Sequence, residues 1–275
     1  MDAAGMLELL PLIVGAPGGV ARVRRLVLDL AFRGRLTPLH AVGTVDDALA
    51  SIAKCRGQLP GADSGRITYE GGLPFSVPEA WVWRPLRDVG AVVGGATPPT
   101  GVAGYFDEKP GHVWLTPADM RKHRRGKFID RGDRYLTSQG AKACSAQRMP
   151  AGSVVFSSRA PIGHVAIAAC ELRTNQGFKS VVPYSMAMSD FVYWYLCHAA
   201  PRIDAMATGT TFKEVSGGFM SGYPIPVPPI ETQAQIVQQI ESLLKLCDQL
   251  DAALARRDNA QTRIAIALGR ALSDV

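Results

Sequence analysis

The sequence predicts an α+β fold in which one mixed, strand-rich domain is flanked by long helices. Near both ends of the chain, apolar residues recur at three- and four-residue steps, which is the period of an amphipathic helix. Between them, short β-branched and aromatic runs alternate with glycine and proline turns, which is typical of short strands joined by irregular loops. The 275 residues are enough to bury a substantial core.

The N-terminal region, 1–59, is predicted to be helical. One helix carries its apolar residues on a single face: Val20, Val23, Leu26, Val27, Leu30 and Ala31. Gly34 is expected to end this helix, because glycine adopts the left-handed cap conformation without strain. A second helix over 46–56 would be capped by Thr44. Residues 60–72 contain glycine and serine and are interpreted as a linker.

The central region, 73–229, is predicted to be the strand-rich domain. Strands are expected at 89–93, 112–115, 153–157, 164–169 and 180–182. A helix is expected over 189–207, and its aromatic run is interpreted as core because it lies beside further apolar residues. The proline-rich stretch 223–229 is predicted to be a stiff, extended connector.

The C-terminal region, 230–275, is predicted to form one long helix. Its apolar residues follow a heptad pattern: Ile236, Ile240, Leu243, Cys247, Leu250, Leu254, Ile264 and Leu268, with Arg257 and Gln261 interrupting. This row requires an apolar partner, either the N-terminal helix or a second copy of the chain. From Glu231 onward there are five basic and six acidic residues, so this helix is a poor candidate for DNA contact.

Basic residues are concentrated in one short segment. The chain has a net charge of +6, and residues 121–134 contain seven basic and two acidic residues, a difference of +5. Clustered cations bind nucleic acid by releasing counterions from its phosphates, so the segment is a candidate phosphate-contacting patch. A solvated charged loop is the alternative interpretation.

Motifs for catalysis, metal binding and membrane insertion are missing from the sequence. It contains no phosphate-binding loop, no dinucleotide-binding glycine motif, no clustered His/Cys metal site and no methyltransferase tetrapeptide. The five cysteines are scattered, and no apolar run approaches the ~20 residues needed to cross a bilayer, so a cytoplasmic protein is expected. Asp107-Glu108-Lys109 leaves open a stand-alone nuclease, although such a short match arises often by chance.

Five segments, in order, resemble the specificity subunits of type I restriction-modification systems. These are the helix end at 23–36, the domain start at 73–86, the motifs T-N-Q-G-F-K-S (174–180) and G-T-T-F-K-E-V (209–215), and Y-P-I-P-V-P-P-I-E-T-Q (223–233) with the helix after it. The resemblance covers nearly the whole chain. It implies a DNA target-recognition domain at 73–229 between conserved helical regions that form a coiled-coil spacer.

The resemblance also implies partners and a division of labour. A standard specificity subunit carries two recognition domains, whereas this chain has one, so a homodimer reading a split, palindromic double-stranded DNA target is expected. The chain itself would be no enzyme and would hold no cofactor. Separate modification subunits would bind S-adenosylmethionine and methylate adenine, and a motor-nuclease subunit would cleave. A coiled-coil scaffold with an incidental basic loop remains the alternative.

Charge and position along the chain indicate the candidate DNA contacts. Lys122, Arg124, Arg125 and Lys127 are predicted to bind phosphates. Arg159, Thr97 and Thr100 lie in loops and are predicted to reach base edges, where arginine and guanine form the commonest specific pair. Lys179 and Lys213 lie in the two family-like motifs and are predicted to contact the DNA backbone. The alternative, which is equally well supported, is that these motifs only form turns and pack in the core.

Overall fold

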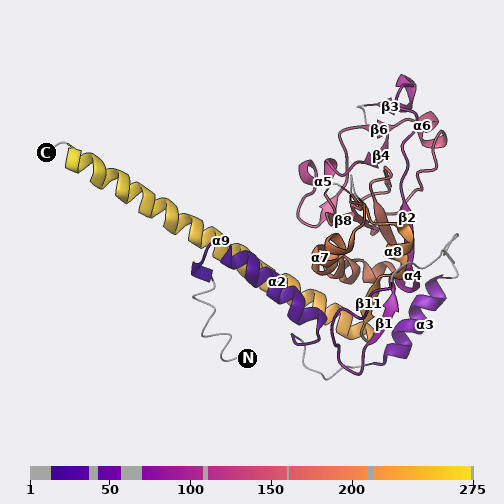
Figure 1. Cartoon of the computed structure of the whole chain (residues 1–275), viewed down its shortest axis with the longest axis horizontal. Helices are drawn as coiled ribbons and strands as arrows, with labels where there is room; N and C mark the ends of the chain where they lie inside the picture. The colour runs from indigo at the N-terminus through magenta and orange to yellow at the C-terminus, as the bar shows by residue number, and fades with distance from the viewer. Residues whose placement is uncertain are drawn as a thin grey trace.

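Figure 1 shows the computed structural model of the chain, which describes residues 14–36, 43–56, 70–107, 111–159, 161–209 and 213–273. A strand-rich body stands at one end of a long helix, and a shorter helix lies along the near part of that helix. The predicted α+β class is confirmed. Within the described ranges, no helix is both long and apolar enough to cross a membrane.

The elements follow one another along the chain with these bounds. The helices are α2 (Gly19–Phe32), α3 (Val45–Arg56), α4 (Leu86–Val89), α5 (Asp119–Lys122), α6 (Ser138–Lys142), α7 (Ser189–Met206), α8 (Gly217–Gly222) and α9 (Ile230–Ser273), with 3-10 turns η1 (Ala103–Tyr105) and η2 (Met186–Met188). The strands are β1 (Val82–Pro85), β2 (Gly90–Gly94), β3 (Phe106–Asp107), β4 (His112–Leu115), β5 (Phe128–Ile129), β6 (Tyr135–Leu136), β7 (Val154–Phe156), β8 (Val165–Ala168), β9 (Arg173–Thr174), β10 (Lys179–Pro183) and β11 (Pro224–Val227).

The body is built on a five-stranded sheet in the order β2–β10–β7–β8–β5. β10 pairs antiparallel with β2, from Lys179 opposite Gly94 to Pro183 opposite Gly90, and β5 joins β8 in parallel. A second layer has the order β3–β6–β4–β9. The five predicted strands are confirmed as β2, β4, β7, β8 and β10, each within one residue of its expected ends.

The proline-rich stretch 223–229 differs from its prediction as a connector. Residues 224–227 form β11, which pairs antiparallel with β1 at the start of the domain, and the whole of 224–229 is buried. Prolines are tolerated here because a two-stranded ribbon leaves alternate backbone N–H groups outside the ladder. The start and the end of the strand-rich domain are therefore held together.

Both N-terminal helices are confirmed. α2 ends at Phe32, and Gly34, which follows the C-cap residue Arg33, has the left-handed φ of +67° that was expected at this helix end. α3 begins after Thr44, and the Thr44 hydroxyl accepts a hydrogen bond from the Asp47 N–H at 3.2 Å while Asp47 accepts one from the Thr44 N–H at 3.1 Å. This reciprocal pair is a capping box. Most of the predicted linker 60–72 lies outside the described residues, as do Glu108 and Lys109 of the nuclease alternative.

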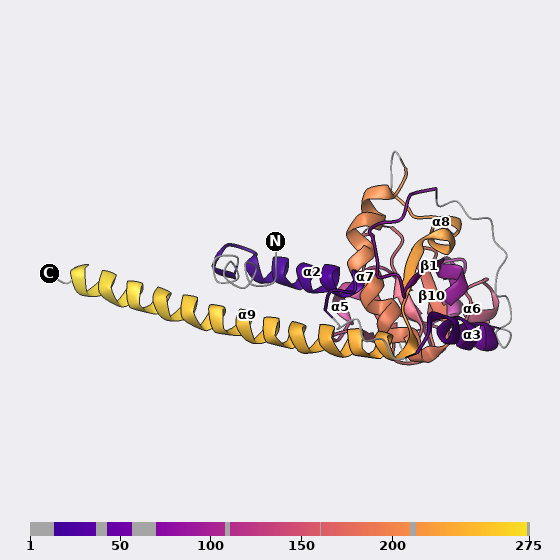
Figure 2. The same ribbon diagram turned by 90° about the horizontal axis from the view of Figure 1, so that it is seen from below.

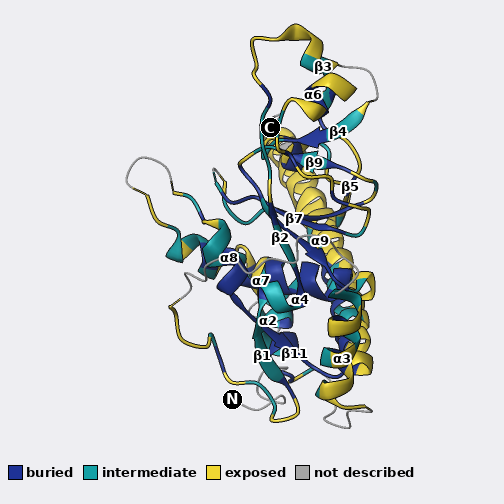
Figure 3. Cartoon of the chain, turned by 90° about the vertical axis from the view of Figure 1, so that its right-hand side faces the viewer, coloured by how far each residue is buried: buried dark blue, intermediate teal, exposed yellow. Residues whose placement is uncertain are grey.

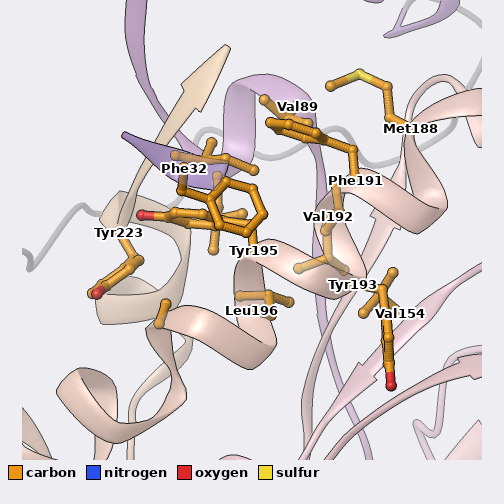
Figure 4. Close-up of a cluster of buried hydrophobic side chains, with 14 of the residues drawn as sticks. Phe32, Val89, Val154, Met188, Phe191, Val192, Tyr193, Tyr195, Leu196 and Tyr223 are labelled. Carbon is orange, nitrogen blue, oxygen red and sulfur yellow. The ribbon is translucent and has the colours of Figure 1, made fainter. Parts of the chain in front are cut away.

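The main core joins the helices to the sheet. Phe32 at the end of α2 is fully buried between α7 aromatics, with ring centroids 5.5 Å from Phe191 and 5.1 Å from Tyr195 in edge-to-face geometry. Figure 4 shows these rings in one packed cluster with Tyr223 and Val89. The interpretation of the aromatic run in α7 as core is thus confirmed, and α2 is anchored inside the strand-rich domain.

Helix α9 is continuous, as predicted, but its surroundings change along its length. Ile236 and Ile240 are fully buried against the body, and α2 runs antiparallel beside the next turns (Figure 2). From 255 to 270 every residue is exposed, and the rod extends away from the body. Figure 3 shows this change from buried to exposed along the helix.

Candidate nucleic-acid interface

The basic segment 121–134 comprises the end of α5, a turn, strand β5 and the loop after it, on the side of the body that faces the distal part of α9 (Figure 1). Its cations are not equivalent. The Lys122 ammonium lies 2.6 Å from an oxygen of Asp133, and the His123 ring nitrogen lies 2.7 Å from the other oxygen. These contacts lower the pKa of Asp133 and raise that of Lys122. Part of the predicted patch therefore carries its own counter-charge.

Lys127 connects three elements. Its ammonium lies 2.6 Å from Asp190 at the start of α7 and 2.5 Å from Glu241 on α9. Burial works to lower the pKa of Lys127, but the hydrogen bonds to the two carboxylates outweigh it and raise that pKa. In the free chain this lysine holds the strand-rich domain on α9, and phosphate contact through it remains a prediction.

Arg121 and Arg124 are two exposed cations of the segment that lie at one concavity. Together with Met120 and His164 they line a concavity of about 340 Å³, and Arg124 Nη1 donates to the Val165 carbonyl at 3.1 Å. In the described part of the chain neither arginine makes an ion pair with a carboxylate. Burial, then Arg124 and Arg121, lower the pKa of His164. A concavity lined by two such guanidinium groups suits a phosphate.

Arg125 is exposed and begins a tight turn. The backbones of Arg125 and Phe128 exchange hydrogen bonds of 2.8 and 3.0 Å, and Gly126 between them has a φ of +57°. A residue with a β-carbon would be strained at that φ, so the glycine fits the turn. The turn presents Arg125 to solvent next to Arg124.

A second group of predicted residues meets where three segments join, and we call this place the motif junction: 157–159, 174–179 and 213–215. The Ser158 N–H donates to the Gly177 carbonyl at 2.8 Å, and the Val215 N–H donates to the Ser158 carbonyl at 2.9 Å. The two family-like motifs are therefore neighbours in space although they are far apart in sequence.

The motif junction brings Arg159 and Lys179 to one carboxylate. Glu214 lies 3.2 Å from the Lys179 ammonium and 3.9 Å from Arg159 Nη1. Lys213, beside Glu214, is exposed. Glu214 and His164 were not among the predicted site residues, and Arg121 was predicted only as a member of the basic segment. All three residues lie in or beside segments that the sequence analysis singles out. Their contacts join residues that are far apart in the chain, so no local sequence pattern could predict them.

The loop with Thr97 and Thr100 packs against the same junction. Gly95 makes this possible, since a β-carbon there would lie 2.1 Å from the Asn175 carbonyl oxygen and 2.2 Å from that of Thr174. The Thr97 hydroxyl donates to the Gln176 side chain, while Thr100 is exposed. The structure therefore gathers Thr97, Arg159 and Lys179 around one motif.

The predicted interface residues of α9 divide into two sets. Ile236, Ile240 and Cys247 are buried by the chain's own helices, and Leu243, Leu250 and Leu254 are half-buried. Ile264 and Leu268 are 61% and 58% exposed. Within the chain, the first set already has the partner that the heptad pattern requires. Only the second set is left without one among the described residues.

Asp119, His123 and Asp133 are close enough together to be considered for a metal. Asp119 accepts hydrogen bonds from the Thr116 N–H at 2.7 Å and from the Asp133 N–H at 2.8 Å, so both of its carboxylate oxygens already have donors. Asp133 is bound to Lys122. Hydrogen bonds and an ion pair explain this cluster, and we assign no metal to it.

Comparison with known proteins identifies relatives for most of the chain. Residues 78–256 match the family model described as type I restriction modification DNA specificity domain. The MjaIX specificity subunit of Methanocaldococcus jannaschii is 32% identical over 195 residues, which is 70% of this chain and 43% of the relative. The EcoAI specificity subunit of Escherichia coli is 23% identical over 91% of this chain and 44% of the relative.

Solved structures share the fold. The HsdS subunit from Thermoanaerobacter tengcongensis matches 91% of this chain and 51% of its own length, with a TM-score of 0.52 and 19% identity. A chain from a study of type I restriction-modification complex assembly and conformational transition matches with a TM-score of 0.57 and 18% identity, over 89% of this chain and 54% of that one. The chain thus spans about half the length of its relatives.

Proposed function

We propose that this chain, which belongs to the type I restriction-modification DNA specificity family, reads the DNA target for a modification and restriction complex. This agrees with its interpretation as a non-catalytic specificity subunit. The proposal rests on one observation: the domain that matches the family model also has exposed arginines with no described ion pair to a carboxylate, Arg121, Arg124 and Arg125. The motif junction lies on the same domain. Phosphate contacts position such a protein, and loop side chains then read bases.

The second part of the proposal is a homodimer through the distal half of α9. That half exposes a row of large apolar side chains on one face of the helix, Ile264, Leu268 and Leu272, which are spaced four residues apart. The occupant we propose is a second copy of this chain, because the relatives are about twice as long. Two copies would place two recognition domains on one DNA, and a two-fold pair reads a palindromic, bipartite target.

The length of α9 would set the spacing between the two half-sites. A helix of 44 residues is about 66 Å long at ~1.5 Å per residue. The nearly neutral charge of this helix suits a role as spacer and docking surface for subunits more than contact with phosphates. The partners we propose are modification subunits, which would bind S-adenosylmethionine and methylate adenine, and a motor-nuclease subunit.

Salt-dependent DNA binding by the full chain tests the phosphate surface. Arg124→Ala should weaken binding to every duplex alike and reduce the slope of log affinity against log salt by about 0.9, the value of one phosphate contact. Arg148→Ala is a matched control, because Arg148 is also exposed but pairs with Glu171 at 3.4 Å. Equal salt slopes for the wild-type chain and Arg124→Ala would show that Arg124 does not contact a DNA phosphate. Salt-insensitive binding, or none, would favour the scaffold alternative.

A further inference from the structure

Glu214 is an acidic residue placed among side chains proposed to bind a polyanion. Its two carboxylate oxygens face different cations, one toward Lys179 at 3.2 Å and the other toward Arg159 at 3.9 Å. DNA phosphates would be repelled by an acid at this position. The location therefore calls for an explanation that phosphate binding alone does not provide.

The backbone, and not the ion pairs, holds Glu214 in place. Its N–H donates to the Thr208 carbonyl at 2.9 Å, and Arg159 and Glu214 form an antiparallel bridge. The Glu214 side chain is 40% exposed, against 16% for Lys179. The carboxylate thus covers the lysine from the solvent side while its own backbone stays fixed in the junction.

A carboxylate and a phosphodiester offer the same chemistry to these cations. Both present anionic oxygens that accept charge-assisted hydrogen bonds from lysine and arginine. A tethered carboxylate acts at a high effective concentration, so an incoming phosphate must displace it. The free energy needed to displace the carboxylate is small, because the Glu214 side chain is partly open to water and such ion pairs are weak.

We infer that Glu214 is a built-in competitor of DNA phosphates that keeps Arg159 and Lys179 out of nonspecific contacts. Nonspecific binding depends almost entirely on phosphates, so withholding two cations weakens it. At a correct target, base contacts from the neighbouring loops supply the free energy that releases both cations to the DNA. Glu214 would thereby widen the gap between specific and nonspecific affinity, which is how selectivity is measured. The inference rests on the proposed DNA-reading function.

Removing the charge of Glu214 tests this inference. Glu214→Gln in the full chain should bind a fluorescent random-sequence duplex about threefold to tenfold more tightly, the effect of releasing two partly exposed ion pairs. The salt slope should steepen by about 1 to 2, because up to two more phosphates are neutralised. Adding Lys179→Met to this variant should return about half of the gain.

Glu171→Gln is the matched control, because it makes the same change in net charge and breaks the surface pair with Arg148 at 3.4 Å. It should change affinity less than twofold. An equal gain in affinity from Glu171→Gln would show that the change in net charge alone causes the effect, and would overturn the inference. Unchanged or weaker binding by Glu214→Gln would overturn it too. A wild-type chain without salt-sensitive binding would instead overturn the proposed function.

A measurement on the wild-type chain avoids any question of folding. A carbodiimide reagent links a carboxylate to a lysine amine in contact with it, and Glu214 and Lys179 meet that condition. Mass spectrometry should detect this cross-link in the free chain and, at equal yield, with saturating random-sequence duplex. Loss of the cross-link on adding random-sequence duplex would show that nonspecific DNA already displaces Glu214, and would contradict the inference.

Discussion

The two halves of α9 share one heptad pattern but have different surroundings. In the proximal half, Ile236 and Ile240 lie in the same core as Phe32 of α2. In the distal half, Ile264 and Leu268 are more than half exposed. A heptad pattern shows that a helix face needs an apolar partner, but it does not show whether that partner is in the same chain. The proximal half builds the fold, and we propose that the distal half builds the assembly.

The same substitution in each half should give the largest contrast. Ile240→Ala leaves a cavity in the core and should lower the free energy of unfolding by about 2–5 kcal/mol. Ile264→Ala should change it by less than about 0.5 kcal/mol, because that side chain is already in water. Urea denaturation at low protein concentration measures both values without a contribution from assembly. Similar losses of unfolding free energy at the two positions would contradict the distinction between a buried proximal half and an exposed distal half.

Charges placed in the distal half should break the assembly and spare the fold. Ile264→Asp with Leu268→Asp should raise the dimer dissociation constant at least a hundredfold, since each copy loses two apolar contacts of about 1.5–3 kcal/mol. Thr262→Asp, on the opposite side of the helix from Ile264, is the control and should stay dimeric. Light scattering with size exclusion measures the mass, and a monomeric wild-type chain would contradict the proposed dimer.

Lys127 tests how the proximal half is tied to the sheet. Lys127→Met leaves Asp190 and Glu241 facing the site without their shared cation, which should cost about 1 kcal/mol after allowing for water access. Lys122→Met removes an exposed pair with Asp133 and should leave Tm unchanged. Thermal unfolding compares the two, and equal effects would mean that Lys127 does not act as a tie.

The smallest expected effect is a pH dependence at the contact of α2 with α7. Burial lowers the pKa of His198 although its ring nitrogen lies 3.3 Å from Asp29. The unfolded state therefore binds the proton more readily, so stability should fall as pH drops below about 6.5, by less than about 1 kcal/mol. His198→Gln should flatten Tm between pH 7 and 5.5, leaving a remainder from His164. A pH slope in His198→Gln equal to that of the wild-type chain would contradict this origin of the pH dependence.

Elements with a clear period could be predicted from the sequence. The strand at 112–115, the helix cap at Thr44 and the long C-terminal helix are all confirmed. The ribbon of β1 and β11 was missed because proline normally argues against a strand, and its pairing partner lies at the far end of the domain. Strands of two residues, such as β5 and β9, are too short to show any period.

The candidate site could be predicted only in part, for a related reason. Charge density along the chain marks the segment 121–134 but does not separate Arg124, which is free of carboxylates, from Lys127, which is held by two. The partners of Lys127 lie far away in sequence, on α7 and α9. Glu214 belongs to a motif that the sequence marks, yet its position between two cations follows from tertiary packing alone.

One measurement tests the central claim, that two copies of this chain read DNA for a methylating complex. Adenine methylation is mapped across the host genome with the chain present, deleted and carrying Ile264→Asp with Leu268→Asp. We predict a split, palindromic methylated target in the first case, and its loss in the other two. Methylation that persists without the chain would contradict the reading function. A target that is not palindromic, or that survives the distal substitutions, would contradict the dimer.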